Sequence, residues 1–236
     1  MGGCTTLHAA SMQGQAQVVE WLLLTGAAVN VPNKDGNTPL HSASQGGSKE
    51  VVELLLRNGA DVGCTRQDGF TPLHCASYHG RKEVVECLVQ NGEDVNFHAK
   101  NGSTPLLCAS QGGTREMVEF LLQNGADTGC TLKNGCTPLH CASQGGKKEI
   151  VEFFLQKGAD VRCASQDGYT PLHCASQNGD KETIAFLLDN GADVCCTKKG
   201  GYTPLHCACQ NGKKAAVEFL LEHGAGVCCR TKVRIL

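Results

Sequence analysis

The residues most able to do chemistry are four histidine–cysteine dipeptides. They are His74-Cys75, His140-Cys141, His173-Cys174 and His206-Cys207. A cysteine close to a histidine can act as a nucleophile with its general base. Adjacent residues on a helix do not face each other, however, and every dipeptide occupies the same place in a recurring motif. We therefore interpret the histidines as structural and the cysteines as small apolar residues, and we predict no catalytic residue.

The sixteen cysteines raise the question of disulfides. Two series recur every 33 residues: Cys75, Cys108, Cys141, Cys174 and Cys207, and Cys64, Cys130, Cys163, Cys196 and Cys229. Equivalent positions in stacked helical units lie roughly 8–10 Å apart, whereas the α-carbons of a disulfide lie within about 7 Å. Members of one series should therefore not pair with each other.

Metal binding is the alternative use of these thiols. A zinc site usually combines two closely spaced pairs of ligands. The chain offers Cys195-Cys196, Cys228-Cys229 and Cys207-x-Cys209, which do not supply four converging ligands. We predict no metal and no cofactor, and keep a thiol-rich redox or metal protein as an alternative, with the two cysteine doublets as its candidates.

Charge and hydropathy limit the partners. Lys and Arg number 21 against 23 Asp and Glu, a net charge of -2, which argues against a nucleic-acid binder held by phosphates. No apolar run reaches the ~18 residues of a membrane span, and residues 1–17 lack the features of a secretory signal. Cysteine-rich chains without such a signal carry reduced thiols, so we expect a cytoplasmic or nuclear location.

The elements that must position these residues repeat every 33 residues. The tetrapeptide Thr-Pro-Leu-His begins at Thr38, Thr71, Thr137, Thr170 and Thr203, with near copies at Thr5 and Thr104. Three glycine series of the same period account for 21 of the 29 glycines. We predict one domain over residues 1–236, with units at about 1–33, 34–66, 67–99, 100–132, 133–165, 166–198 and 199–231 and a short tail at 232–236.

Each unit predicts two helices. Thr71 can cap a helix whose first residue is Pro72, which predicts a helix over 72–79 that Gly80 ends in the left-handed conformation. The apolar spacing that follows predicts a second helix over 82–90. Such a pair cannot bury its apolar faces alone, so we expect the units to stack into an all-α repeat solenoid.

These residues resemble a known family. Residues 35–62, DGNTPLHSASQGGSKEVVELLLRNGADV, are similar to the consensus of the ankyrin repeat, and the resemblance covers essentially the whole chain. It implies helix pairs with β-hairpin loops on one side, and a concave surface of hairpin tips and first helices that binds proteins. It also implies that the motif histidine braces the turns by hydrogen bonds.

Two modifications follow from local patterns. The ankyrin resemblance implies that a hairpin asparagine can be hydroxylated, and Asn96 fits with Leu88, Asp94 and Val95 around it. The start of the chain fits a lipidation pattern, with Gly2 as the myristoylation residue and Cys4 able to take a second acyl chain. Both patterns have an ordinary structural interpretation as well: a turn residue for Asn96, and repeat positions near the N-terminus.

Recognition should lie where the units differ. The third unit places Phe70, Tyr78 and His79 on what we expect to be one surface, and Tyr169 and Tyr202 form a second candidate patch. Exposed aromatic residues are typical anchors of protein interfaces. The ordinary alternative is scattered surface aromatics that need no explanation.

The favoured function is a non-enzymatic interaction module, a scaffold or adaptor with a protein partner. The alternative is a regulatory or targeting segment of a larger multidomain enzyme or receptor. Neither end of the repeat series has the polar face of a dedicated cap, as the apolar run from Trp21 to Leu24 illustrates. End-to-end self-association or a longer array would cover such ends.

Overall fold

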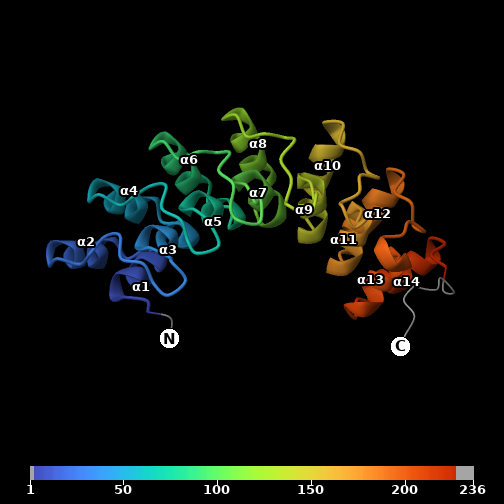
Figure 1. Ribbon diagram of the computed structural model, residues 1–236, viewed down its shortest axis with the longest axis horizontal. Helices are drawn as coiled ribbons and strands as arrows, with labels where there is room; N and C mark the ends of the chain where they lie inside the picture. The colour runs from blue at the N-terminus through green and yellow to red at the C-terminus, as the bar shows by residue number, and fades with distance from the viewer. Residues whose placement is uncertain (1–2, 227–236) are drawn as a thin grey trace. The chain divides into compact units, whose positions relative to one another are not determined.

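The computed structural model describes residues 3–226, which form fourteen α-helices and one 3-10 turn (Figure 1). The helices are α1 (Thr6–Met12), α2 (Ala16–Leu24), α3 (Pro39–Gly46), α4 (Lys49–Arg57), α5 (Pro72–Tyr78), α6 (Lys82–Gln90), α7 (Pro105–Gly112), α8 (Arg115–Gln123), α9 (Pro138–Gly145), α10 (Lys148–Gln156), α11 (Pro171–Asn178), α12 (Lys181–Asp189), α13 (Pro204–Gln210) and α14 (Lys214–Glu222), with the 3-10 turn η1 at Lys199–Gly201. The described residues contain no strand, so the all-α class is confirmed.

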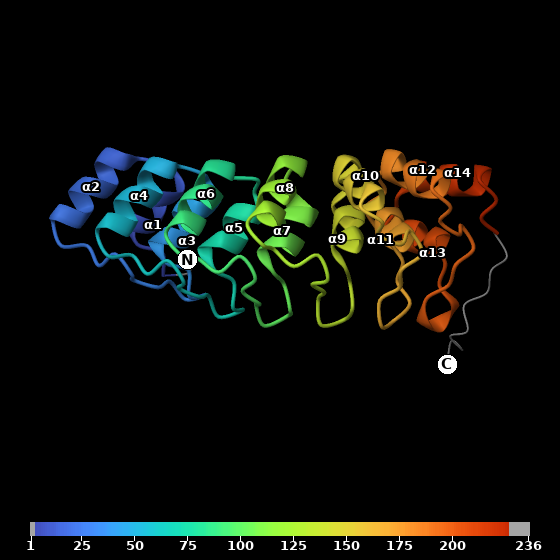
Figure 2. The same cartoon turned by 90° about the horizontal axis from the view of Figure 1, so that it is seen from above.

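The helices group into two compact units. Unit 1 contains the chain up to Ala109 together with Glu116–Asp127, and unit 2 contains Ser110–Arg115 together with the chain from Thr128. In unit 1, α1, α3 and α5 pack side by side, as do α2, α4 and α6. In unit 2, α9, α11 and α13 form one row and α10, α12 and α14 another. Figure 2 shows that, within each unit, the hairpin loops project to one side of these rows.

The helix boundaries follow from the motif. Thr71 is the extended N-cap of α5, with φ -98° and ψ 169°, and Pro72 occupies the first turn. Gly80 adopts φ 66° just after the helix, and α6 spans Lys82–Gln90. Both predicted helices and the left-handed glycine are therefore confirmed, with α5 one residue shorter than expected.

The hairpin loops are tight turns and not strands. The Arg66 N–H donates to the Phe70 carbonyl at 2.9 Å, and the Gly69 N–H donates back to Arg66 at 3.0 Å. Gly69 has φ 86°, and a Cβ there would lie 2.9 Å from the Lys100 backbone nitrogen, so this turn requires glycine. Successive tips are joined by backbone bonds such as Lys100 N–H to Asp68 O at 3.0 Å.

The core is the apolar face that the second helices press against the first. Val84, Val85 and Leu88 of α6 are completely buried, as their spacing predicts. One helix face is left open: in α2 the side chains of Trp21 and Leu24 are 63% and 81% exposed. In the inner second helices, Cys87 and Phe153 at the Trp21 position are buried, whereas the Leu24 position carries exposed polar residues such as Arg57.

Candidate functional site

The motif histidines form a hydrogen-bond lattice that joins neighbouring repeats. In the third repeat, the Thr71 N–H donates to His74 Nδ1 at 3.2 Å, with Thr71 Oγ1 3.0 Å from the same nitrogen. Since Nδ1 accepts, Nε2 carries the proton and donates to the Ser103 carbonyl of the next repeat at 3.1 Å. The same pattern recurs at His8, His41, His140 and His173.

Burial keeps the imidazoles of His41, His74, His140 and His173 neutral, because it lowers the pKa of each. It lowers the pKa of His41, His74 and His173 to about 4, well below the usual value near 6.5. Both ring nitrogens are already occupied by hydrogen bonds within the fold. The histidine of each histidine–cysteine dipeptide described in this way is therefore a structural brace.

A second cysteine series approaches the same histidines from the loops. Cys64 Sγ lies 3.6 Å from His41 Nδ1 and 3.3 Å from Thr38 Oγ1. The equivalent Cys163 and Cys196 lie 3.7 Å from the Nδ1 atoms of their histidines. This pairing joins residues 23 positions apart, so the adjacent histidine–cysteine dipeptides do not reveal it; the constant spacing of the loop cysteines from the motif is the signal that could.

The geometry looks like a nucleophile with its base, but the protonation states oppose that role. Burial raises the pKa of Cys64 to about 11 and also raises the pKa of Cys163 and Cys196. A thiolate is the reactive form of cysteine, and a histidine with a pKa near 4 is a poor base at neutral pH. These contacts pack a protonated thiol against a neutral ring.

The helix cysteines are buried as well. Burial raises the pKa of Cys75 to about 11 and that of Cys108 to about 12. The fourteen cysteines among the described residues form no disulfide, and over residues 3–226 no three His, Cys, Asp or Glu side chains gather as metal ligands. Cys228 and Cys229 lie outside the described residues.

The predicted aromatic patch of the third repeat divides between the two ends of α5. Phe70 precedes the helix, where its half-buried ring lies 5.0 Å from the His74 ring and 5.3 Å from the Arg66 guanidinium. Tyr78 ends the helix and is 42% exposed, and its ring meets the exposed His79 edge-on at 5.2 Å. Seven helical residues separate the ends by roughly 10 Å, so Phe70 does not belong to the Tyr78–His79 pair.

The two tyrosines of the second patch are brought together by a lysine. Lys198 Nζ lies 4.3 Å from the centre of the Tyr169 ring and 4.7 Å from that of Tyr202. Beside them, Lys199 pairs with Asp167 at 2.7 Å and joins the same two hairpins. Cation–π contacts of this kind contribute about 0.5–1 kcal/mol each at exposed sites.

Asn96 holds two repeats together. Its Nδ2 donates to the Gly125 carbonyl at 2.9 Å, and its Oδ1 accepts from the Asp127 N–H at 2.8 Å. Asn30 makes the corresponding bonds with Gly59 and Asp61. We call this arrangement the asparagine clamp; it could not be predicted from local sequence, because both partners lie one repeat away.

Of the two candidate lipidation residues near the N-terminus, the structure describes Cys4. Cys4 is exposed and accepts a 3.4 Å contact from Asn33 Nδ2. Gly2 lies outside the described residues. Among residues 3–226, no helix combines the length and the apolar character needed to cross a membrane.

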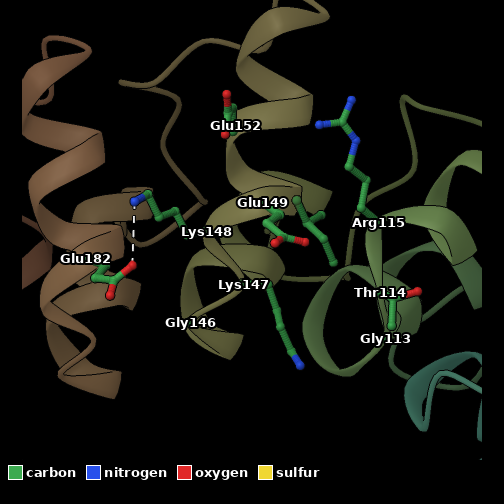
Figure 3. Close-up of a pocket in the computed structure, with 10 residues that line it drawn as sticks. Gly113, Thr114, Arg115, Gly146, Lys147, Lys148, Glu149, Glu152 and Glu182 are labelled. Atoms are coloured by element: carbon green, nitrogen blue, oxygen red, sulfur yellow. Dashed lines mark hydrogen bonds and ion pairs between the residues drawn. The ribbon is translucent and has the colours of Figure 1, made fainter.

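A polar hollow of about 590 Å³ lies in unit 2, between the turn at Gly113–Arg115 and the start of α10 (Figure 3). Lys148 Nζ is 3.5 Å from Glu182 Oε2, and the Arg115 guanidinium lies over the Phe153 ring at 5.3 Å. In Figure 3 the Lys147 and Arg115 side chains lead away from each other. Charges of mixed sign that do not converge favour a solvated surface over a ligand site.

Comparison with known families agrees with the repeat geometry. A family model described as ankyrin repeats in three copies matches residues 2–66, 47–131, 82–165, 109–198 and 157–231. A comparison with curated proteins gives no match.

Proposed function

The chain belongs to the ankyrin-repeat family, and from this premise we propose that it is a non-enzymatic scaffold or adaptor that binds a protein partner through its hairpin and first-helix surface. Ankyrin repeats are generally protein–protein interaction modules. The protonation states support the non-enzymatic part, because the contact between His41 and Cys64 joins a neutral imidazole to a protonated thiol.

The observation that carries the proposal is the exposed pair of Tyr78 and His79. Five other repeats have glutamine at the Tyr78 position, and three of those have glycine next to it. Tyr78 is 42% exposed, and its edge-on contact with His79 holds the ring in place before any partner binds. An exposed, ordered aromatic ring loses little conformational entropy on binding, which is why such residues act as interface anchors.

Phe70, Tyr169 and Tyr202 complete the proposed contact residues. Each precedes a first helix, and each is half-buried, with a cationic side chain over its ring. An aromatic ring beside a cation offers a partner both apolar contact and charge.

The test introduces residues that other repeats of the chain already have at the same positions. Tyr78→Gln with His79→Gly gives the third repeat the residues of its neighbours, so the fold should be retained. The tagged full chain, this double variant and a Gln144→Ala control are each used to capture proteins from cytosol, followed by mass spectrometry. We expect a partner that the wild type and the control retain and the double variant loses by about tenfold or more.

An unchanged set of captured proteins would overturn the proposed contact residues. A second double variant, Tyr169→Ala with Tyr202→Ala, then tests whether the other patch carries binding. Thermal unfolding of each variant shows whether a loss of binding is a loss of fold.

The same proposal places the protein in a reducing compartment, the cytoplasm or the nucleus, and it is supported by fourteen described cysteines that form no disulfide. It also retains Asn96 as a hydroxylation acceptor. Its amide is engaged on both sides by the asparagine clamp, so a hydroxylase would have to open that loop first. A 16 Da mass increase on the Asn96 peptide from cells would test the modification.

A further inference from the structure

The hairpin that precedes α13, in unit 2, fixes a lysine between two aromatic rings. Lys198 Nζ lies 4.3 Å from the centre of the Tyr169 ring and 4.7 Å from that of Tyr202. The backbone of this lysine is held as well, because its N–H donates to the Tyr202 carbonyl at 2.9 Å and its carbonyl accepts from the Gly201 N–H at 3.0 Å. The ammonium group is therefore positioned before any partner binds.

The third repeat shows which group joins a cation and a ring at this place. Arg66 occupies the repeat position of Lys198, and its guanidinium lies 5.3 Å from the ring of Phe70, the counterpart of Tyr202. Arg66 Nε donates to Asp68 Oδ1 at 3.2 Å, and a second guanidinium nitrogen pairs with Oδ2. A ring, a cation and a carboxylate thus occur together in one hairpin.

The hairpin of Lys198 lacks this carboxylate. The other described hairpins have an aspartate or an asparagine at the Asp68 position, and these residues are Asp35, Asn101, Asn134 and Asp167. The counterpart before α13 is Gly200, which adopts φ 83° and has no side chain that could neutralise Lys198. Among residues 3–226, Lys198 forms no ion pair.

The charges around Lys198 leave it uncompensated. Asp167, in the preceding hairpin, is paired with Lys199, whose Nζ lies 2.7 Å from its Oδ1. The hydrogen bond from Lys199 is the main cause that lowers the pKa of Asp167, and the charge of Lys198 adds a smaller effect. His173 contributes no charge at neutral pH, because burial lowers its pKa to about 4. One positive charge therefore stands beside two half-buried rings.

We infer that the protein partner supplies the missing carboxylate, as an Asp or Glu side chain of an acidic peptide segment that binds Lys198 between Tyr169 and Tyr202. The inference rests on the proposed function, because it gives the partner chemistry of one proposed contact patch. One lysine balances one carboxylate, whereas sites for phosphorylated peptides combine several arginines. The two rings cover the apolar stem of the acidic side chain and exclude water, which strengthens the ion pair.

The test uses immobilised libraries of short peptides that are random except for one central residue, fixed as Asp, Glu, Asn, Gln or phosphoserine. Binding of the full chain to each library is measured for the wild type and three variants. Lys198→Gln removes the cation, and Lys198→Arg restores it with the residue that the third repeat has. Lys133→Gln removes an exposed lysine of another hairpin in unit 2 and is the matched control for net charge.

We expect the wild type to bind the Asp and Glu libraries about threefold or more above the Asn and Gln libraries. Lys198→Arg and Lys133→Gln should keep this preference, and Lys198→Gln should lose it. A preference that persists in Lys198→Gln, or a wild type without any preference, would overturn the inference.

Stronger binding to the phosphoserine library than to the Asp and Glu libraries would overturn it as well, because the ligand would then be a phosphorylated peptide. These outcomes are separate from a failure of the proposed function. That function is tested by the capture of proteins from cytosol, which we expect to depend on Tyr78 and His79.

Discussion

At one repeat position, which is glycine at Gly63 and Gly129, the other described side chains that join hairpin loops differ between the two units. In unit 1, Asn96 donates to one backbone carbonyl and accepts from one backbone N–H, and Asn30 does the same. In unit 2, Arg162 donates through Nε to the Gly191 carbonyl at 2.8 Å. At Cys195 the contact is between its sulfur and the Gly224 carbonyl, at 3.8 Å.

The difference follows from the donors and acceptors that each side chain owns. An amide can donate and accept at once, a guanidinium can only donate, and a thiol is a weak donor. The backbone acceptor is the same in all four cases, the glycine after a second helix. Because the fold persists while this bond changes, helix stacking defines the repeat, and the loop bond adjusts how firmly neighbouring hairpins are held.

The largest expected change in stability concerns Glu93 of unit 1, a buried acidic residue at a position where unit 2 has alanine. The other repeats have alanine here, such as Ala159 and Ala192 in unit 2. Glu93 is only 6% exposed, and its buried Oε2 has no hydrogen-bond partner. Burial raises its pKa to about 7, and the carboxylates of Asp61 and Asp94 act in the same direction.

The sign of the pH effect follows from this shift. The folded state holds the Glu93 proton more tightly than the unfolded chain, so its contribution is favourable below pH 4.5 and is lost as the pH rises to about 7. We expect Glu93→Ala to raise the free energy of unfolding by about 2 kcal/mol at pH 8, and this gain to vanish below pH 4.5. Urea denaturation at both pH values measures it.

The control is Glu83→Ala, which removes an exposed carboxylate of α6 and should change the free energy of unfolding by less than about 0.5 kcal/mol. The buried histidines oppose the Glu93 trend, because a lowered pKa makes their contribution fall as the pH drops from about 6.5 to 4. They act equally in the wild type and the variant and cancel in the difference. A Glu93→Ala effect of the same size at pH 4.5 and pH 8 would contradict the prediction.

The next test breaks the asparagine clamp. Asn96→Ala removes two hydrogen bonds and should lower the free energy of unfolding by about 1–2 kcal/mol. It should also speed hydrogen exchange at the Asp127 N–H, which loses its acceptor. Cys195→Ala is the matched change in unit 2, and we expect it to alter stability by less than about 0.5 kcal/mol. Equal losses at the two positions would show that the clamp adds nothing to the loop.

The repeat architecture was predictable because its signals are local. The threonine–proline start, the left-handed glycine and the apolar spacing each act within one unit, and they predicted α6 at its observed bounds. The asparagine clamp and the contact of Cys64 with His41 join residues 23 to 31 positions apart. Their geometry depends on how repeats stack, which composition and periodicity do not specify.

The candidate surface was predictable only in part for the same reason. Variation between repeats identified Tyr78 and His79, which the structure brings into contact. Variation between repeats did not show that Phe70 lies apart from Tyr78 and His79, because the length of α5, and not the residue types, sets that distance. Lys198, between the two tyrosines, was missed because a surface lysine carries no signal in one sequence.

The smallest expected effect installs the clamp where unit 2 lacks it. Cys195→Asn would place an amide beside the Gly224 carbonyl, with the Gly226 N–H in the register that Asp61 and Asp127 occupy in unit 1. We expect a gain of about 0.5–1 kcal/mol and slower hydrogen exchange at the Gly226 N–H, whereas Cys195→Ser, too short to reach both groups, should change neither. Unchanged exchange at Gly226 in the asparagine variant would mean that the clamp depends on the loop backbone of unit 1, and that the side chain alone does not account for the difference between the units.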